Sequence, residues 1–229
     1  LDFHGAFKPT GLRREYPNTS FTYAPGREQS NILLVSQGRV QLGIAHAQLA
    51  GRALSGGEPF KQPVTNIRAI AVIDPLAAMQ VFARQGSDFQ SFEQVRRDKK
   101  PIRVALNQRG TMMALAGEEL LAAKGIPAKD IEAWGGKVHY VAYNEGLEMM
   151  KNKQVDLIVN LLAFPSGQVA SATREMPVQM VGLTPEVQGA LQKSLGMMPI
   201  EVPAKTYDFQ PAAVPSATAT VVLVANASM

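Results

Sequence analysis

The sequence contains no cysteine in its 229 residues. Disulfide bridges and thiol catalysis are therefore excluded, and a structural zinc site is disfavoured because cysteine is its usual ligand. The sequence also has no apolar run of the roughly 20 residues that a membrane-spanning helix requires. The amino end, LDFHGAFKPTG, lacks the apolar core of a signal peptide. These absences, with 46% apolar and 18% charged residues, are typical of a soluble globular protein.

A strong excess of one charge is missing as well. The 23 basic and 19 acidic residues leave a net charge of +4. This value favours anionic partners slightly but falls short of the basic footprint of a nucleic-acid-binding protein, so we expect no nucleic-acid partner. The densest basic run, residues 96–100 followed by Arg103, is expected to be solvated loop surface.

Short apolar runs alternate with segments of helical periodicity. Strands are expected at residues 19–24, 40–45, 67–73, 79–84, 102–106, 138–143, 155–160, 178–183 and 219–225. Helices are expected within residues 28–38, 113–125, 144–154, 164–175 and 184–196, and three of these segments end in glycine, which is common after a helix. The alternation predicts an α/β fold with parallel sheets flanked by helices.

Ligands of such folds bind at the carboxyl ends of the strands. The residues that follow the expected strands are polar and rich in amides, and the turn from Asn107 through Arg109 and Gly110 to Thr111 is the most informative. A helix start leaves free backbone N–H groups that attract anions, and Thr111 is a favoured N-cap residue. The turn therefore predicts an anion site, although a capped surface helix accounts for the same residues.

Recognisable catalytic motifs are missing from the sequence. The histidines at positions 4, 46 and 139 are far apart, and none has a second ligand three or four residues away. No nucleophile elbow, Walker loop or dinucleotide fingerprint follows a strand. We therefore expect a binding protein with no catalytic residues, no cofactor and no metal, rather than an enzyme.

Four blocks, in this order, resemble the TAXI family of TRAP-transporter solute receptors. They are NILLVSQGRVQLGIAHAQLA (31–50), VFARQGSDFQSFEQVRRDKKPIRVAL (81–106), AYNEGLEMMKNKQVDLIVNLLAFPSGQV (142–169) and VPSATATVVLVANASM (214–229). The resemblance implies a type II periplasmic binding fold with a ligand cleft between two α/β lobes. Lobe one would be residues 1–82 plus 221–229 and lobe two residues 83–220. The crossing strands would be residues 79–84 and 220–225.

The resemblance also implies a function. A monomer outside the cytoplasm, in the periplasm or an equivalent place, would capture a small anionic solute of the glutamate-like or 2-oxoacid class. It would deliver this solute to the permease subunits of a TRAP transporter. Relative to the family the chain is expected to be truncated at both ends. The alternative is a ligand-sensing effector domain of a regulator or signalling protein with the same fold.

The implied ligand contacts divide between the two lobes. Lobe two would contribute Asn107, Arg109, Gly110, Thr111, Met112, Asn160 and Phe164, and lobe one Arg27, Asn31, His46, Gln48, Phe7 and Lys8. Three of these have structural alternatives: His46 as a loop residue, Asn31 as a helix cap and Phe164 as part of the core. The chain also departs from the family, because Met112 and Met113 replace small residues and would make the pocket larger or more apolar.

Overall fold

The computed structural model describes residues 26–229. The first elements, as far as the long second strand, are α3 (Glu28–Ser36), β1 (Leu42–His46), α4 (Ala47–Ser55) and β2 (Ile67–Arg84). The chain continues through α5 (Phe92–Asp98), β3 (Arg103–Leu106), α6 (Met112–Ala123), α7 (Ala128–Ala133), β4 (Lys137–Tyr140) and α8 (Tyr143–Lys151). It ends with β5 (Leu157–Leu162), α9 (Gly167–Ala172), β6 (Val178–Met180), α10 (Pro185–Leu195), β7 (Met198–Val202) and β8 (Val214–Asn226).

The described strands form one mixed sheet in the order β1-β8-β2-β5-β3-β4, with β6 added to β2 and β7 to β8. Strand β3 is parallel to β4 and β5. The other pairings, including β1 with β8 and β2 with β5, are antiparallel. The α/β fold is confirmed. The expected parallel pairing is found for β3, β4 and β5 but not for the rest of the sheet, because β2 and β8 run in opposite directions through its centre.

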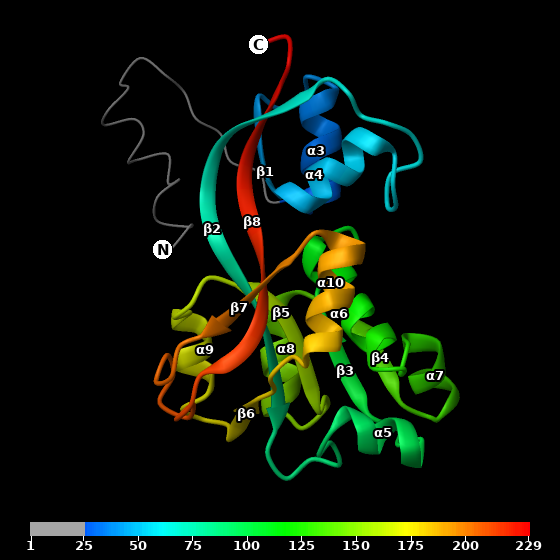
Figure 1. The fold of residues 1–229 in the computed structure, drawn as a ribbon, viewed down its shortest axis with the longest axis vertical. Helices are drawn as coiled ribbons and strands as arrows, with labels where there is room; N and C mark the ends of the chain where they lie inside the picture. The colour runs from blue at the N-terminus through cyan, green and yellow to red at the C-terminus, as the bar shows by residue number, and fades with distance from the viewer. Residues whose placement is uncertain (1–25) are drawn as a thin grey trace.

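The two long strands connect the two ends of the molecule. Figure 1 shows β2 and β8 side by side, running from the group formed by β1, α3 and α4 to the group that contains α5 to α10. The sequence predicted two strands, 67–73 and 79–84, where β2 is continuous. Asp74 and Pro75 do not end the strand, because Asp74 Oδ1 accepts a hydrogen bond from Leu76 N at 2.9 Å and the register against β8 shifts there. Such an irregularity accommodates a proline that cannot donate to the ladder.

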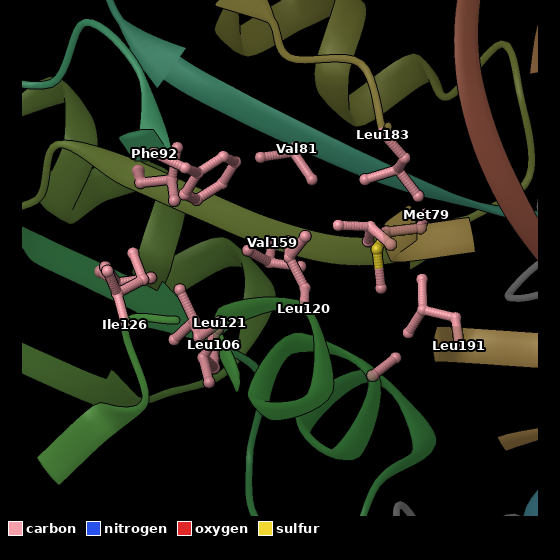
Figure 2. Packing of buried hydrophobic residues seen from close by; sticks show 14 of the residues in the cluster. Met79, Val81, Phe92, Leu106, Leu120, Leu121, Ile126, Val159, Leu183 and Leu191 are labelled. Carbon is pink, nitrogen blue, oxygen red and sulfur yellow. The ribbon is translucent and has the colours of Figure 1, made fainter. Parts of the chain in front are cut away.

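Buried side chains gather at both ends of these strands. One cluster packs α3 and α4, through residues such as Ile32 and Leu49, against Val222 and Val224 of β8. A larger cluster surrounds β3, β5 and the second half of β2, and Figure 2 shows Met79, Val159, Leu120 and Leu191 among its members. A third cluster fills the opposite face beneath α8 and α9. Two helical groups thus have their own cores, and the proposed lobe boundaries, 82/83 and 220/221, stay a prediction.

Three helices and a strand were not expected from the sequence: α4, α5, α7 and β7. Helix α5 includes residues 96–98, so the interpretation of residues 96–100 as loop is wrong for these three and holds for 99 and 100. Ser91 Oγ caps it by accepting a hydrogen bond from Gln94 N at 3.1 Å, and it ends at Lys99, whose φ is 48°. Its charged residues are exposed on a short helix whose buried residues are Phe92 and Val95. Two buried apolar residues are too few to form a recognisable helical period. The sequence therefore did not predict α5.

No helix between residues 26 and 229 is long and apolar enough to cross a bilayer.

Candidate functional site

The candidate site lies where the two ends of the sheet meet. Strands β3, β4 and β5 are parallel, so their carboxyl ends share one edge. The pairing order makes β1 run in the opposite direction to β5, so the end of β1 faces this edge. The starts of α3, α4, α6 and α8 follow or adjoin these strand ends (Figure 1). Helix starts and strand ends therefore converge at one junction, as expected for a ligand site in an α/β protein.

Glu28, in the first turn of α3, occupies the start of α6. Its Oε2 accepts a hydrogen bond from the backbone N–H of Met112 at 2.5 Å. Its Oε1 accepts from the backbone N–H of His46 at 3.1 Å and is also paired with His46 Nδ1. A carboxylate of the chain itself thus fills the anion site predicted at this helix start.

The environment of Glu28 favours its ionised form. Burial alone would raise the pKa of its carboxyl group, since the side chain is only 14% exposed. The charge and hydrogen bond of His46, together with the two backbone N–H donors, outweigh burial and hold the pKa below the usual 4.5. Glu28 was missed by the sequence interpretation, because no local pattern shows that a residue in one helix contacts an amide 84 positions later.

Further contacts join the start of α3 to the turn before α6. The backbone N–H of Gln29 donates to the carbonyl of Gly110 at 3.0 Å, and Arg27 Nη1 reaches the carbonyl of Arg109 at 3.4 Å. Gly110 has a φ of 82°, and a Cβ at this position would lie 2.8 Å from Gln29 Oε1. The backbone conformation therefore favours glycine, and a Cβ here would require the flexible Gln29 side chain to move.

Helix α4 makes a second set of contacts across the junction. Gln48 Nε2 lies 3.4 Å from the carbonyl of Gly196, and Arg52 Nη2 donates to the carbonyl of Ser194 at 2.8 Å. Both acceptors lie at the carboxyl end of α10, where helix carbonyls have no further partner within the helix. The two ends of the molecule are therefore joined at two separate helix termini.

Arg109 lies on the surface beside α6 with its side chain 66% exposed. Its Nη1 is 3.3 Å from Glu118 Oε1, and its guanidinium lies 3.5 Å from the centre of the Tyr140 ring. Tyr140 donates a hydrogen bond to the same carboxylate at 2.5 Å. Burial, and then Glu118, raise the pKa of Tyr140 to about 12. The positive charge of Arg109 is accessible but already has two partners.

Three site candidates have structural roles in this arrangement. Thr111 is the N-cap of α6, as the sequence predicted, and its Oγ1 accepts from Ala114 N at 3.2 Å. The Met112 side chain is completely buried in the large core cluster and contributes only its backbone N–H to the junction. Asn31 Nδ2 donates to the carbonyl of Ile44 at 2.9 Å and ties α3 to β1. This bond differs from the helix cap considered for Asn31.

A second part of the site is a small hollow between β3, β5 and the start of α8, with a volume of about 10 Å³. Asn107, Tyr143 and Asn160 are its polar lining residues. Asn160 is 1% exposed, and its Oδ1 accepts from Leu161 N at 3.0 Å. Its Nδ2 and the Tyr143 hydroxyl are buried without a hydrogen-bond partner among residues 26–229. The sequence predicted Asn107 and Asn160 as site residues but not Tyr143. Tyr143 lies three residues after the end of β4, and this position after a strand is the signal that could have identified it.

Comparison with known proteins places this arrangement in a family. Residues 24–229 match the model of the NMT1-like family. The chain belongs to the NMT1-like family. No curated protein matches the sequence.

Solved structures share the fold of this NMT1-like chain. PhnD1 from Prochlorococcus marinus, in complex with methylphosphonate, has a TM-score of 0.57 at 11% identity, over 96% of this chain and 68% of its own. The alkanesulfonate-binding protein SsuA from Xanthomonas axonopodis pv. citri, bound to MOPS, has 0.51 at 14% identity, over 94% and 58%. HinK, a LysR family transcriptional regulator from Pseudomonas aeruginosa, has 0.54 at 12% identity, over 100% and 60%.

The NMT1-like chain therefore has the mixed α/β fold of type II periplasmic binding proteins. It spans less than two thirds of the length of SsuA and HinK. The fold class expected from the sequence is confirmed, and membership of the TAXI family in particular stays a prediction.

The remaining residues that the sequence predicted as ligand contacts of the NMT1-like chain lie at the following positions. His46 ends β1 and precedes α4, is 3% exposed, and has no partner for Nε2 within the described residues. Phe164 is partly buried two residues after β5. Phe7 and Lys8 lie outside the described residues. Across residues 26–229 no three His, Asp or Glu side chains are grouped as a metal site requires.

Proposed function

We propose that this chain is a solute-binding protein that captures a small molecule at the junction of two lobes. The lobes would be residues 1–82 plus 221–229 and residues 83–220, joined by β2 and β8. The observation that carries the proposal is the convergence of the ends of β1, β3 and β5 with the starts of α4, α6 and α8. The proposed role is binding and not catalysis, in keeping with neighbours that are described as binding proteins.

Capture would proceed by a shift between open and closed arrangements. A solute that bridges the lobes binds the closed arrangement more tightly and so increases its population. In the structure the Glu28 carboxylate makes this bridge from α3 to α6. We propose that a carboxylate of the solute takes its place at the Met112 N–H, with Arg109 and Arg27 nearby. His46, Gln48, Asn107, Gly110, Thr111 and Asn160 would line the same junction.

The proposed solute is anionic, of the glutamate-like or 2-oxoacid class. Two neighbours are described with oxyanions bound, methylphosphonate and MOPS, which supports an anion without identifying it. Delivery to the permease subunits of a TRAP transporter, from a periplasmic or other extracytoplasmic location, completes the proposal and rests on the resemblance of the four sequence blocks.

A sensing role is the second candidate. HinK covers the whole of this chain and is a transcriptional regulator. The same capture by lobe closure would then report a solute to an attached output domain rather than deliver it to a permease. A DNA-binding helix pair or a membrane-spanning segment in the full-length gene product would favour sensing.

The experiment is a thermal-shift screen against carboxylates, amino acids, 2-oxoacids, methylphosphonate and MOPS. A ligand that binds only the native state raises the melting temperature. We expect a hit among the carboxylates whose shift is lost in Arg109→Ala and kept in Arg97→Ala. Arg97 is the matched control because it is also exposed and paired with a carboxylate, Asp98, but lies on α5. Absence of any shift across the panel would contradict the proposal.

A further inference from the structure

Two buried polar groups in the hollow beneath α8, the side-chain amide nitrogen of Asn160 and the hydroxyl of Tyr143, lack a hydrogen-bond partner among the described residues. Asn160 comes from β5 at the centre of the sheet and Tyr143 is the first residue of α8. Leaving a buried polar group unpaired lowers the stability of the folded state. Such a cost is expected where a ligand supplies the missing partner.

The unpaired groups are donors. Asn160 Oδ1 is already bonded to Leu161 N, so the free atom of its amide is Nδ2, which can only donate. Burial raises the pKa of Tyr143, which keeps its hydroxyl protonated and able to donate. Ala142, the N-cap of α8, makes no side-chain cap, and the start of a helix carries partial positive charge. All three features favour an oxygen atom of a ligand.

The lining lacks charge. Its members other than Asn107, Tyr143 and Asn160 are Ala105, Leu106, Val141, Ala142, Gly146, Ile158 and Val159. A full negative charge held there would have no counter-ion, and an unpaired buried charge is far more costly than a bonded neutral oxygen. At about 10 Å³ the space has room for about one water-sized group, so it suits a single oxygen atom at one end of a ligand.

We propose that the hollow holds a neutral carbonyl oxygen of the solute, which accepts hydrogen bonds from Asn160 Nδ2 and the Tyr143 hydroxyl. This inference rests on the proposed solute-binding function and extends it. The start of α6 would bind the anionic end of the solute, and the hollow its uncharged, oxygen-bearing end. The solute class is then a small carboxylate that also has a ketone or amide carbonyl group.

Acetamide and acetate provide a matched pair of probes, since they have nearly the same shape and differ in charge. Each is titrated into the full chain and followed by NMR at the Asn160 side-chain amide and the backbone amides of residues 143–146. We expect acetamide to shift these signals and to bind more tightly than acetate. Tyr143→Phe, which removes only the hydroxyl, should weaken acetamide binding by about 3- to 10-fold, the usual worth of one hydrogen bond.

Asn160→Leu should abolish the acetamide shifts, and Asn152→Leu, at the exposed C-cap of α8, is its matched control and should leave them unchanged. If Asn160→Leu does not fold, Tyr143→Phe decides. The inference is overturned if acetamide leaves these signals unmoved, if acetate binds as tightly, or if Tyr143→Phe has no effect.

The experiments distinguish a failure of the carbonyl subsite from a failure of the proposed solute-binding function. A solute from the thermal-shift screen that binds wild type, Tyr143→Phe and Asn160→Leu equally would leave solute binding intact and overturn the carbonyl subsite. Acetamide binding in the hollow with no response across the screen would support the subsite and contradict the proposed solute class.

Discussion

The carboxylate of Glu28 lies against the first backbone amide of α6, 2.5 Å from Met112 N. This contact joins the first turn of α3 to a helix that begins 84 residues later, and His46 holds the other carboxylate oxygen. An acidic side chain of the chain itself therefore occupies the position that the sequence assigned to an anionic ligand.

Glu28→Gln is expected to lower the free energy of unfolding by about 1–3 kcal/mol. The reason is that hydrogen bonds to a charged acceptor stabilise more than those to a neutral amide oxygen. Urea unfolding followed by circular dichroism measures the change. Glu201→Gln on β7 is the control, since Glu201 is exposed and forms no ion pair with another described residue, and it should behave as wild type. Equal stability of wild type and Glu28→Gln would show that the bridge contributes nothing.

The stabilisation from Glu28 is expected to depend on pH in the acid range. Because the pKa of Glu28 is lower in the folded protein than its usual 4.5, the folded state binds its proton less readily than the unfolded state. The contribution is therefore complete above pH 4.5 and is lost as the pH falls through the lowered pKa. The stability difference between wild type and Glu28→Gln, measured from pH 7 down to pH 3, should narrow. A constant difference would be inconsistent with the lowered pKa.

Glu28→Gln is also expected to increase the affinity for an anionic solute, by about fivefold or more. The internal carboxylate competes with the solute for the Met112 N–H, and loss of its charge weakens the competitor. Isothermal titration of a carboxylate hit from the screen, into wild type and variant, measures the ratio. A weaker affinity in Glu28→Gln would instead make Glu28 a direct ligand contact.

Tyr140 is expected to titrate near pH 12 and to shift downward in Glu118→Gln. Burial is the larger cause of its raised pKa and remains in the variant, so the value should fall part of the way toward 10. Loss of the Glu118 charge removes the second cause. NMR of ring-labelled tyrosine resolves Tyr140 from the other tyrosines. An unchanged pKa of Tyr140 in Glu118→Gln would show that Glu118 does not raise it. A return of the pKa to 10 would show that burial does not raise it.

Gly110→Ala is expected to destabilise the chain by about 1–2 kcal/mol, because an alanine is disfavoured at positive φ. Its Cβ would also lie 2.8 Å from Gln29 Oε1, so the flexible end of the Gln29 side chain would have to move. Gly189→Ala in α10 is the opposite case, since its Cβ would meet no atom within 4 Å. There alanine should stabilise the helix by about 0.5–1 kcal/mol. Thermal unfolding compares both with wild type, and opposite signs are the expected result.

The sequence alone was sufficient to predict the alternation of strands and helices. It also predicted that the site lies at the carboxyl ends of the strands. Apolar periodicity is local, so β1, β3, α6 and α10 could be located within a few residues. Thr111 as the N-cap of α6 was predictable for the same reason, since a cap bonds an amide only three residues away. Asn107 and Asn160 followed from the rule that strand ends form the site, and the hollow brings these two together.

Only the tertiary structure decided how the site is filled. The direction of a strand relative to its neighbours depends on which strands it pairs with, and the local sequence pattern does not contain that information. The antiparallel pair β2 and β8 therefore makes the sheet mixed, although the sequence pattern suggested a parallel one. The bond from Met112 to Glu28 and the unpaired groups of Tyr143 and Asn160 arise between segments far apart in the sequence. Composition and spacing indicate which groups can bond, but the packing of α3 and α8 onto the sheet determines which of them already have a partner.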